Sequence, residues 1–93
     1  MSGDSADRGG GPQLPSLDFS TFVLSIIGSA YVHLGDAPNP EGQSEQDMEL
    51  ARQDLDLLGI LHEKTKGNLS GEEERLLDQA LFDLRARFVE ITK

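Results

Sequence analysis

The sequence predicts an all-α protein of three helices, because three segments repeat apolar residues at helical spacing and glycine or proline falls between them. The connection between the second and third segments is very short, which predicts a long antiparallel helical hairpin. The chain has 93 residues, enough for one domain. We therefore expect one helical domain over residues 17–93, with an apolar first helix packed on the hairpin.

Residues 1–16 differ from the rest of the chain in composition. They hold a run of three glycines at 9–11 and two prolines, Pro12 and Pro15. Such a segment cannot bury a core, so it predicts a disordered Gly/Pro-rich tail. A phosphate-binding loop is excluded, because no Gly-Lys pair occurs anywhere in the chain.

The first helix is expected over residues 18–34. Asp18 or Ser20 can cap its amino end, and Gly35 suits its carboxyl end. No charged residue occurs between positions 19 and 34, and the large apolar residues fill an arc of roughly 200° on a helical wheel. A helix without a charged face is usually buried on most sides.

The opposite side of this helix is also uncharged, and its side chains are mostly small. It consists of Thr21, Ser25, Gly28, Ser29 and Val32. Small residues let two helices approach closely. We therefore expect this stripe to form a homodimer interface, which completes a helical bundle.

The hairpin follows a linker at 36–43 that contains two prolines. We expect the second helix over about 45–66, capped by Ser44 and stopped by Gly67. The third helix begins at a capping box formed by Ser70 and Glu73. Its apolar residues follow heptad spacing, which predicts a packed seam: Leu77, Leu81, Leu84, Phe88 and Ile91.

Four polar residues are candidates for buried positions: Asp54, Arg87, His33 and His62. Asp54 and His62 fall inside the apolar arc of the second helix, and a carboxylate there is costly unless it is paired. Arg87 lies near the apolar arc of the third helix and is the expected partner of Asp54. Arg85, His33 or a residue across the dimer remain alternatives. The cluster is either a structural ion pair or a perturbed acid in a functional cleft.

The sequence offers no catalytic, cofactor-binding or metal-binding motif. His62-Glu63 begins like H-E-x-x-H, but the fifth residue is Lys66. No G-x-S-x-G elbow occurs, and the absence of cysteine removes thiol chemistry and thiolate metal sites. We therefore expect a protein that is not an enzyme and uses no cofactor.

The chain is acidic, with 17 Asp and Glu against 8 Lys and Arg, a net charge of −9. Nucleic-acid affinity comes largely from basic side chains, so DNA and RNA are not expected partners. The uncharged stretch at 19–34 spans only ~24 Å, short of the ~30 Å hydrocarbon core, which disfavours membrane insertion. The polar, acidic amino end contains no signal peptide, which predicts a cytoplasmic protein.

Four stretches resemble a small bacterial family, domain of unknown function 1844. They are DFSTFVLS at 18–25, VHLG at 32–35, LLGILHEKTKGNL at 57–69 and LFDLR at 81–85. The resemblance covers about residues 17–90. It implies a short helical bacterial protein and supplies no reaction, cofactor or catalytic residue.

The functional expectation is a non-enzymatic, self-associating helical protein that acts as an interaction, scaffold or regulatory module. A second apolar patch on the third helix, Phe82, Ala86 and Val89, is the expected contact for a protein partner. Two alternatives stay open. One is a metal or small-ligand binder at an intersubunit polar site, and the other is a peripheral membrane adaptor that uses the first helix.

Overall fold

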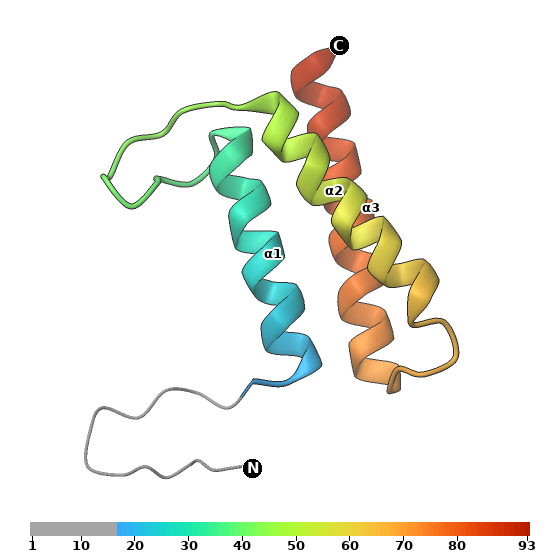
Figure 1. The fold of residues 1–93 in the computed structure, drawn as a ribbon. Coiled ribbons are helices and arrows are strands. Elements are labelled where there is room, and N and C mark those ends of the chain that lie inside the picture. Colours follow the sequence, from blue (N-terminus) through green and yellow to red (C-terminus); the bar gives the residue numbers. More distant parts are fainter. Residues whose placement is uncertain (1–16) are drawn as a thin grey trace, which may run out of the picture.

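The computed structural model describes residues 17–93, and the predicted tail at 1–16 lies outside the described residues. The described chain contains three helices, α1 (Phe19–Leu34), α2 (Met48–Lys64) and α3 (Gly71–Thr92), and no strand. The helices α2 and α3 form an antiparallel hairpin, and α1 runs antiparallel to α2 (Figure 1). The predicted all-α class and the hairpin are confirmed.

Local capping signals set both ends of α1. The Asp18 carboxylate accepts a hydrogen bond of 2.8 Å from the backbone N–H of Thr21, which is the expected amino-terminal cap. At the other end Gly35 has a φ of 86°, and its N–H bonds the carbonyls of Tyr31 and Val32. Such a left-handed cap favours glycine, so the predicted stop at Gly35 is confirmed.

The start predicted for α2 is wrong. Its cap is Asp47 rather than Ser44, because the Asp47 carboxylate accepts from the backbone N–H of Leu50 at 3.1 Å. The Asp47 N–H donates to the carbonyl of His33 at 2.8 Å, which ties the end of the linker to the end of α1. This tertiary bond keeps the residues before Met48 out of the helix. At its carboxyl end α2 stops at Lys64, two residues before the expected end.

The helix α3 begins at the predicted capping box. The Glu73 N–H donates to the Ser70 hydroxyl at 3.1 Å, and the Ser70 N–H donates to the Glu73 carboxylate at 2.8 Å. The heptad residues of α3 pack in the core. Leu77, Leu81 and Leu84 are buried, and Phe88 and Ile91 are partly buried. All three helices contribute to the core, which consists of Val23, Ala30, Leu34, Ala51, Leu58, Leu77, Ala80, Leu81 and Leu84.

None of the helices between residues 17 and 93 has both the length and the hydropathy needed to span a bilayer.

The packing of α3 predicts very different stability losses for substitutions at two nearby positions, Phe82 and Leu84. Leu84 is 0% exposed, whereas Phe82 is 71% exposed. We expect Leu84→Ala to lower the free energy of unfolding by ~2–5 kcal/mol, because it leaves a cavity in the core. Phe82→Ala removes more atoms but should cost less than ~1 kcal/mol, because its ring is already hydrated. Urea denaturation of both variants measures the difference, and equal losses would contradict the packing.

Candidate functional site

A polar cluster joins α1 to α2 beside the core. Its centre is Asp54, which is 7% exposed and is the only buried charged residue between positions 17 and 93. One Asp54 oxygen lies 2.6 Å from Nδ1 of His33, and the Ser29 hydroxyl lies 3.3 and 3.4 Å from the two oxygens. A buried carboxylate is tolerated when it is paired in this way. The expectation that Asp54 lies on the packed face is confirmed.

The predicted partner of Asp54 was wrong. Arg87 instead clamps Asp36 of the linker, with Nε 2.7 Å from Oδ2 and Nη2 2.9 Å from Oδ1. Its remaining Nη1 donates to Glu90 at 2.9 Å. The helical wheel placed Asp54 on a packed side of α2, but it could not tell that this side faces α1 rather than α3. His33, one of the alternatives left open, is the observed partner.

The Ser29–His33–Asp54 cluster does not have the geometry of a hydrolase triad. In a triad the serine contacts one ring nitrogen of histidine and the carboxylate contacts the other. Here both groups face Nδ1 of His33, at 3.5 Å for Ser29 and 2.6 Å for Asp54. The serine also stands on a regular helix instead of a strained turn. The arrangement therefore satisfies a buried charge and fixes two helices together.

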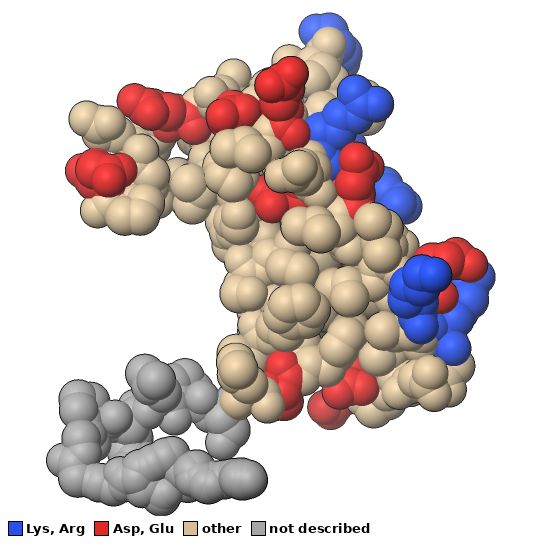
Figure 2. All heavy atoms as spheres, in the orientation of Figure 1, with Lys and Arg blue, Asp and Glu red and all other residues tan. Residues whose placement is uncertain are grey.

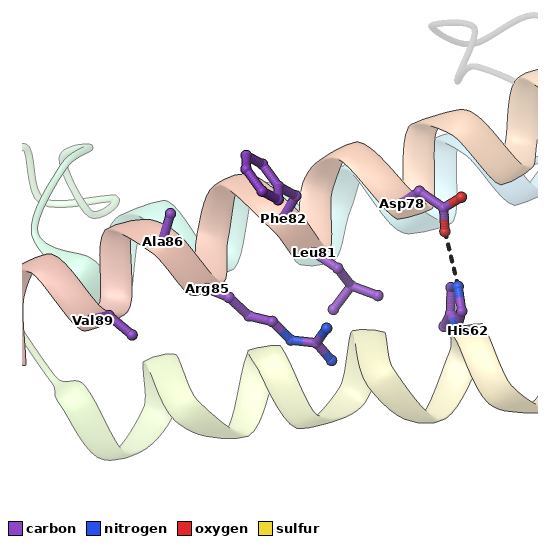
Figure 3. Close-up of a pocket in the computed structure, with 7 residues that line it drawn as sticks. All are labelled: His62, Asp78, Leu81, Phe82, Arg85, Ala86 and Val89. Carbon is purple, nitrogen blue, oxygen red and sulfur yellow. Dashed lines mark hydrogen bonds and ion pairs between the residues drawn. The ribbon is translucent and has the colours of Figure 1, made fainter.

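The second histidine bridges α2 and α3. His62 Nε2 lies 2.8 Å from a carboxylate oxygen of Asp78, and both side chains are substantially exposed (Figure 3). The prediction that His62 is buried is therefore wrong, because the pair lies at the rim of the hairpin. Sequence reasoning missed Asp78. Its signal was available, because residues 62 and 78 lie at equal distances from the cap at Ser70 in an antiparallel hairpin.

A groove runs beside the predicted partner patch on α3. Phe82 and Val89 are 71% and 60% exposed, and Ala86 lies between them. The groove has a volume of about 620 Å³. Its remaining lining comes from Leu81, Arg85 and the His62–Asp78 pair (Figure 3). The exposure expected for this patch is therefore observed.

Arg85 forms the α2-facing wall of this groove. Its guanidinium extends toward α2, where a Cβ at Gly59 would lie 3.6 Å from Nη2 (Figure 3). Within residues 17–93 Arg85 makes no ion pair, although the chain has more than twice as many acidic as basic residues. The groove thus combines an apolar floor with a guanidinium that can bind a carboxylate.

The predicted interface stripe on α1 is only partly exposed. Ser25 and Gly28 are exposed, whereas Thr21 and Val32 are half-buried. Ser29 is also half-buried, and its hydroxyl faces Asp54 rather than solvent. Ser25 and Gly28 therefore face solvent, whereas Ser29 belongs to the polar cluster with Asp54.

Metal binding has little structural support in the described part of the chain. No group of three or more His, Asp or Glu side chains within residues 17–93 is arranged to hold an ion. The two histidines belong to separate clusters, one between α1 and α2 and one between α2 and α3.

Electrostatics tie the linker to α3. The hydrogen bonds from Arg87 hold the pKa of Asp36 below its ordinary value, and the same contacts raise the pKa of Arg87. At the start of α1, the backbone N–H of Thr21 lowers the pKa of the capping Asp18. The carboxylates of Asp18 and Asp36 thus fix the two ends of α1 while they are ionised.

Fold and site together define a small α-helical protein with a structural polar cluster and an apolar groove. The family described as "Domain of unknown function (DUF1844)" matches residues 16–90, and the chain belongs to this family. Comparison with curated proteins and with solved structures gave no significant match. The resemblance found in the sequence is thereby confirmed, and the family description carries no activity.

A double-mutant cycle tests the observed partner of Asp54. We expect Asp54→Ala to lower the free energy of unfolding by ~1.5–3 kcal/mol, because it removes a charged hydrogen-bond acceptor. The coupling energy between Asp54→Ala and His33→Ala should exceed ~0.5 kcal/mol, whereas the cycle with Arg87→Ala should fall below it. Urea denaturation supplies both cycles. If Asp54 coupled to Arg87 and not to His33, the observed pairing of Asp54 with His33 would be wrong.

The Asp36–Arg87 clamp predicts a pH dependence. A carboxyl group whose pKa is lower in the folded chain stabilises the fold above its unfolded pKa of ~3.9 and loses that effect as the pH falls through the folded value. Asp36→Asn should therefore be less stable than wild type near neutral pH, and the gap should close in acid.

The matched control is Glu41→Gln, in the same linker but without an ion pair among the described residues. Thermal melts at a series of pH values measure both variants. A stability gap for Asp36→Asn that persists down to about pH 2 would show that charge pairing is not its cause.

Proposed function

We propose that this protein is a non-enzymatic, self-associating interaction module of the cytoplasm. Its partner is a protein that docks an amphipathic helix in the groove between α2 and α3. The observation that carries the proposal is the exposed apolar row of Phe82, Ala86 and Val89 beside that groove.

The spacing of this row suits a helix as the occupant. Its members are four and three residues apart, so they form one stripe along α3. An amphipathic helix binds such a groove through anchors at the matching spacing. The groove is a shallow surface feature, whereas small molecules are usually enclosed on most sides. A partner helix fits it better than a small ligand does.

The positive charge of Arg85 in the groove favours a partner helix that carries an acidic residue. Arg85 lines the groove and makes no ion pair within residues 17–93, whereas the Asp78 carboxylate already contacts His62. A partner helix that carries an Asp or Glu beside its apolar anchors can therefore form an ion pair with Arg85. Such a pair contributes mainly to orientation and specificity.

The polar clusters support a non-enzymatic role. Asp54, His33 and Ser29 contact one another, and no buried side-chain nitrogen or oxygen in the described residues lacks a hydrogen bond. Catalytic sites commonly keep such groups directed at a substrate. The alternative of an intersubunit ligand site requires further ligands from a second chain. The membrane-adaptor alternative requires α1 to bind lipid.

Partner capture followed by direct titration tests the proposal. The full chain is used to capture proteins from the native cell, in wild-type form and as Phe82→Ser/Val89→Ser. An identified protein is then purified and titrated with both forms by calorimetry. We expect the double variant to weaken binding at least ~10-fold, because two apolar anchors are lost.

The control is Ile60→Ser, which removes an exposed apolar side chain from α2 that does not line the groove. It should leave the affinity unchanged. Equal binding by wild type and the groove variant would contradict the docking site, as would loss of affinity in the control alone.

A further inference from the structure

We infer that a second copy of this chain packs on the outward side of α1, so that the two α1 helices cross near Gly28. The surface concerned, the α1 outer face, consists of Thr21, Leu24, Ser25, Gly28 and Val32. This inference rests on the self-association in the proposed function and names the face and the occupant. It does not depend on the groove of α3.

The α1 outer face is apolar and carries no charge. None of the 25 charged residues of the chain (17 acidic and 8 basic) lies in α1, and Figure 2 shows a broad uncharged surface over the middle of this helix. Leu24, the largest side chain of this face, is 53% exposed. Single exposed apolar side chains are common on soluble proteins, whereas a contiguous apolar patch marks an interaction surface.

Exposed leucines of α2 extend this surface. Leu50 and Leu57 stand four residues before and three residues after Asp54, so they share the side of α2 that faces α1. Phe22, seven residues before Ser29, is exposed on the corresponding side of α1. The uncharged surface therefore continues from α1 onto α2.

The packing within a single chain does not explain why position 28 is a glycine. Glycine is among the poorest helix formers, and Gly28 stands in the middle of α1. A Cβ at this position would meet nothing within 4 Å, so no neighbour in the described chain requires its absence. A close approach by a helix from outside explains the glycine at 28.

Ser25, beside Gly28, is compatible with an apolar neighbour. Its hydroxyl donates to the carbonyl of Phe22 at 2.7 Å, within the same helix. A serine bonded in this way can be covered by another helix without leaving its donor unsatisfied. The exposed part of the stripe thus offers no unpaired side-chain donor that would oppose burial.

The charge distribution favours a second copy as the occupant, because the same face on another chain also carries no charge. Two chains of −9 repel each other, so they meet most favourably where neither presents a charge. Among the three helices only α1 provides such a face, since α2 and α3 both carry charged residues on their outer sides. A protein attracted by the acidic charge would be basic and would bind elsewhere.

The size of the face sets the expected strength. The helix α1 has 16 residues and is therefore ~24 Å long and ~10 Å wide. The face of α1 alone therefore covers only ~240 Å², well below the ~800 Å² that each partner contributes to a standard interface. We expect a weak, reversible dimer with a dissociation constant in the upper micromolar range.

Sedimentation equilibrium of the full chain from about 1 µM to about 1 mM tests the inference. Wild type should pass from monomer to dimer within this range. Leu24→Lys should weaken the dimer at least ~10-fold, because it places a cation in the contact. Phe82→Lys, the matched control in the groove of α3, should not change it.

Gly28→Ala supplies a readout that a general loss of folding cannot imitate. Alanine is a better helix former, so the variant should melt at a higher temperature at concentrations where the chain is monomeric. The same methyl group should weaken the dimer several-fold, because it separates the two helices. Opposite signs for monomer stability and association are expected only for a close contact at Gly28.

Three outcomes would overturn the inference. Wild type could stay monomeric over the whole range, or Leu24→Lys and Gly28→Ala could both leave the dimer intact. The monomer could instead bind neutral phosphatidylcholine vesicles through this face, with binding lost in Leu24→Lys. Each result is independent of partner capture, which depends on Phe82 and Val89.

Discussion

The contact between Asp54 and the Ser29–His33 pair is the interaction on which the placement of α1 depends. The apolar arc of α1 is so wide that packing alone would tolerate several rotations of this helix about its axis. The buried carboxylate removes that freedom, because it must find its hydrogen-bond donors on α1. Once Ser29 and His33 face α2, the side of α1 that carries Leu24 and Gly28 must face outward. One polar contact thus decides which surface the protein presents.

A small core explains why so much apolar surface stays outside. Only nine apolar side chains between residues 17 and 93 are buried, and three of them are alanines. Two short helices and one longer helix cannot enclose all the leucines, isoleucines and aromatic rings that they carry. The linker compensates in part through the clamp between Asp36 and Arg87, which fastens it to the end of α3. Some of the exposed apolar residues lie on two surfaces: Leu24 on the α1 outer face, and Phe82 and Val89 along the groove of α3.

The sequence predicted those features that depend on neighbours along the chain. The caps at Asp18, Gly35 and Ser70 are local hydrogen-bond patterns, so they could be recognised without a fold. The heptad seam of α3 could likewise be predicted from the spacing of its apolar residues. The partner of Asp54 and the start of α2 were not, because both depend on how α1 meets α2 across a long linker. The Asp47–His33 backbone bond has no sequence signature, and a helical wheel gives an angle without naming the neighbour.

The two apolar surfaces have no residue in common, and this separation has a consequence for binding. In a dimer joined through α1, each copy keeps its own groove between α2 and α3, so the assembly presents two grooves. A partner that is itself dimeric, or that carries two suitable helices, can then engage both at once. The second contact forms at the effective concentration set by the first, which raises the overall affinity without any new interaction. A weak dimer and a shallow groove can together produce a tight and specific complex, and dissociation of the dimer releases it.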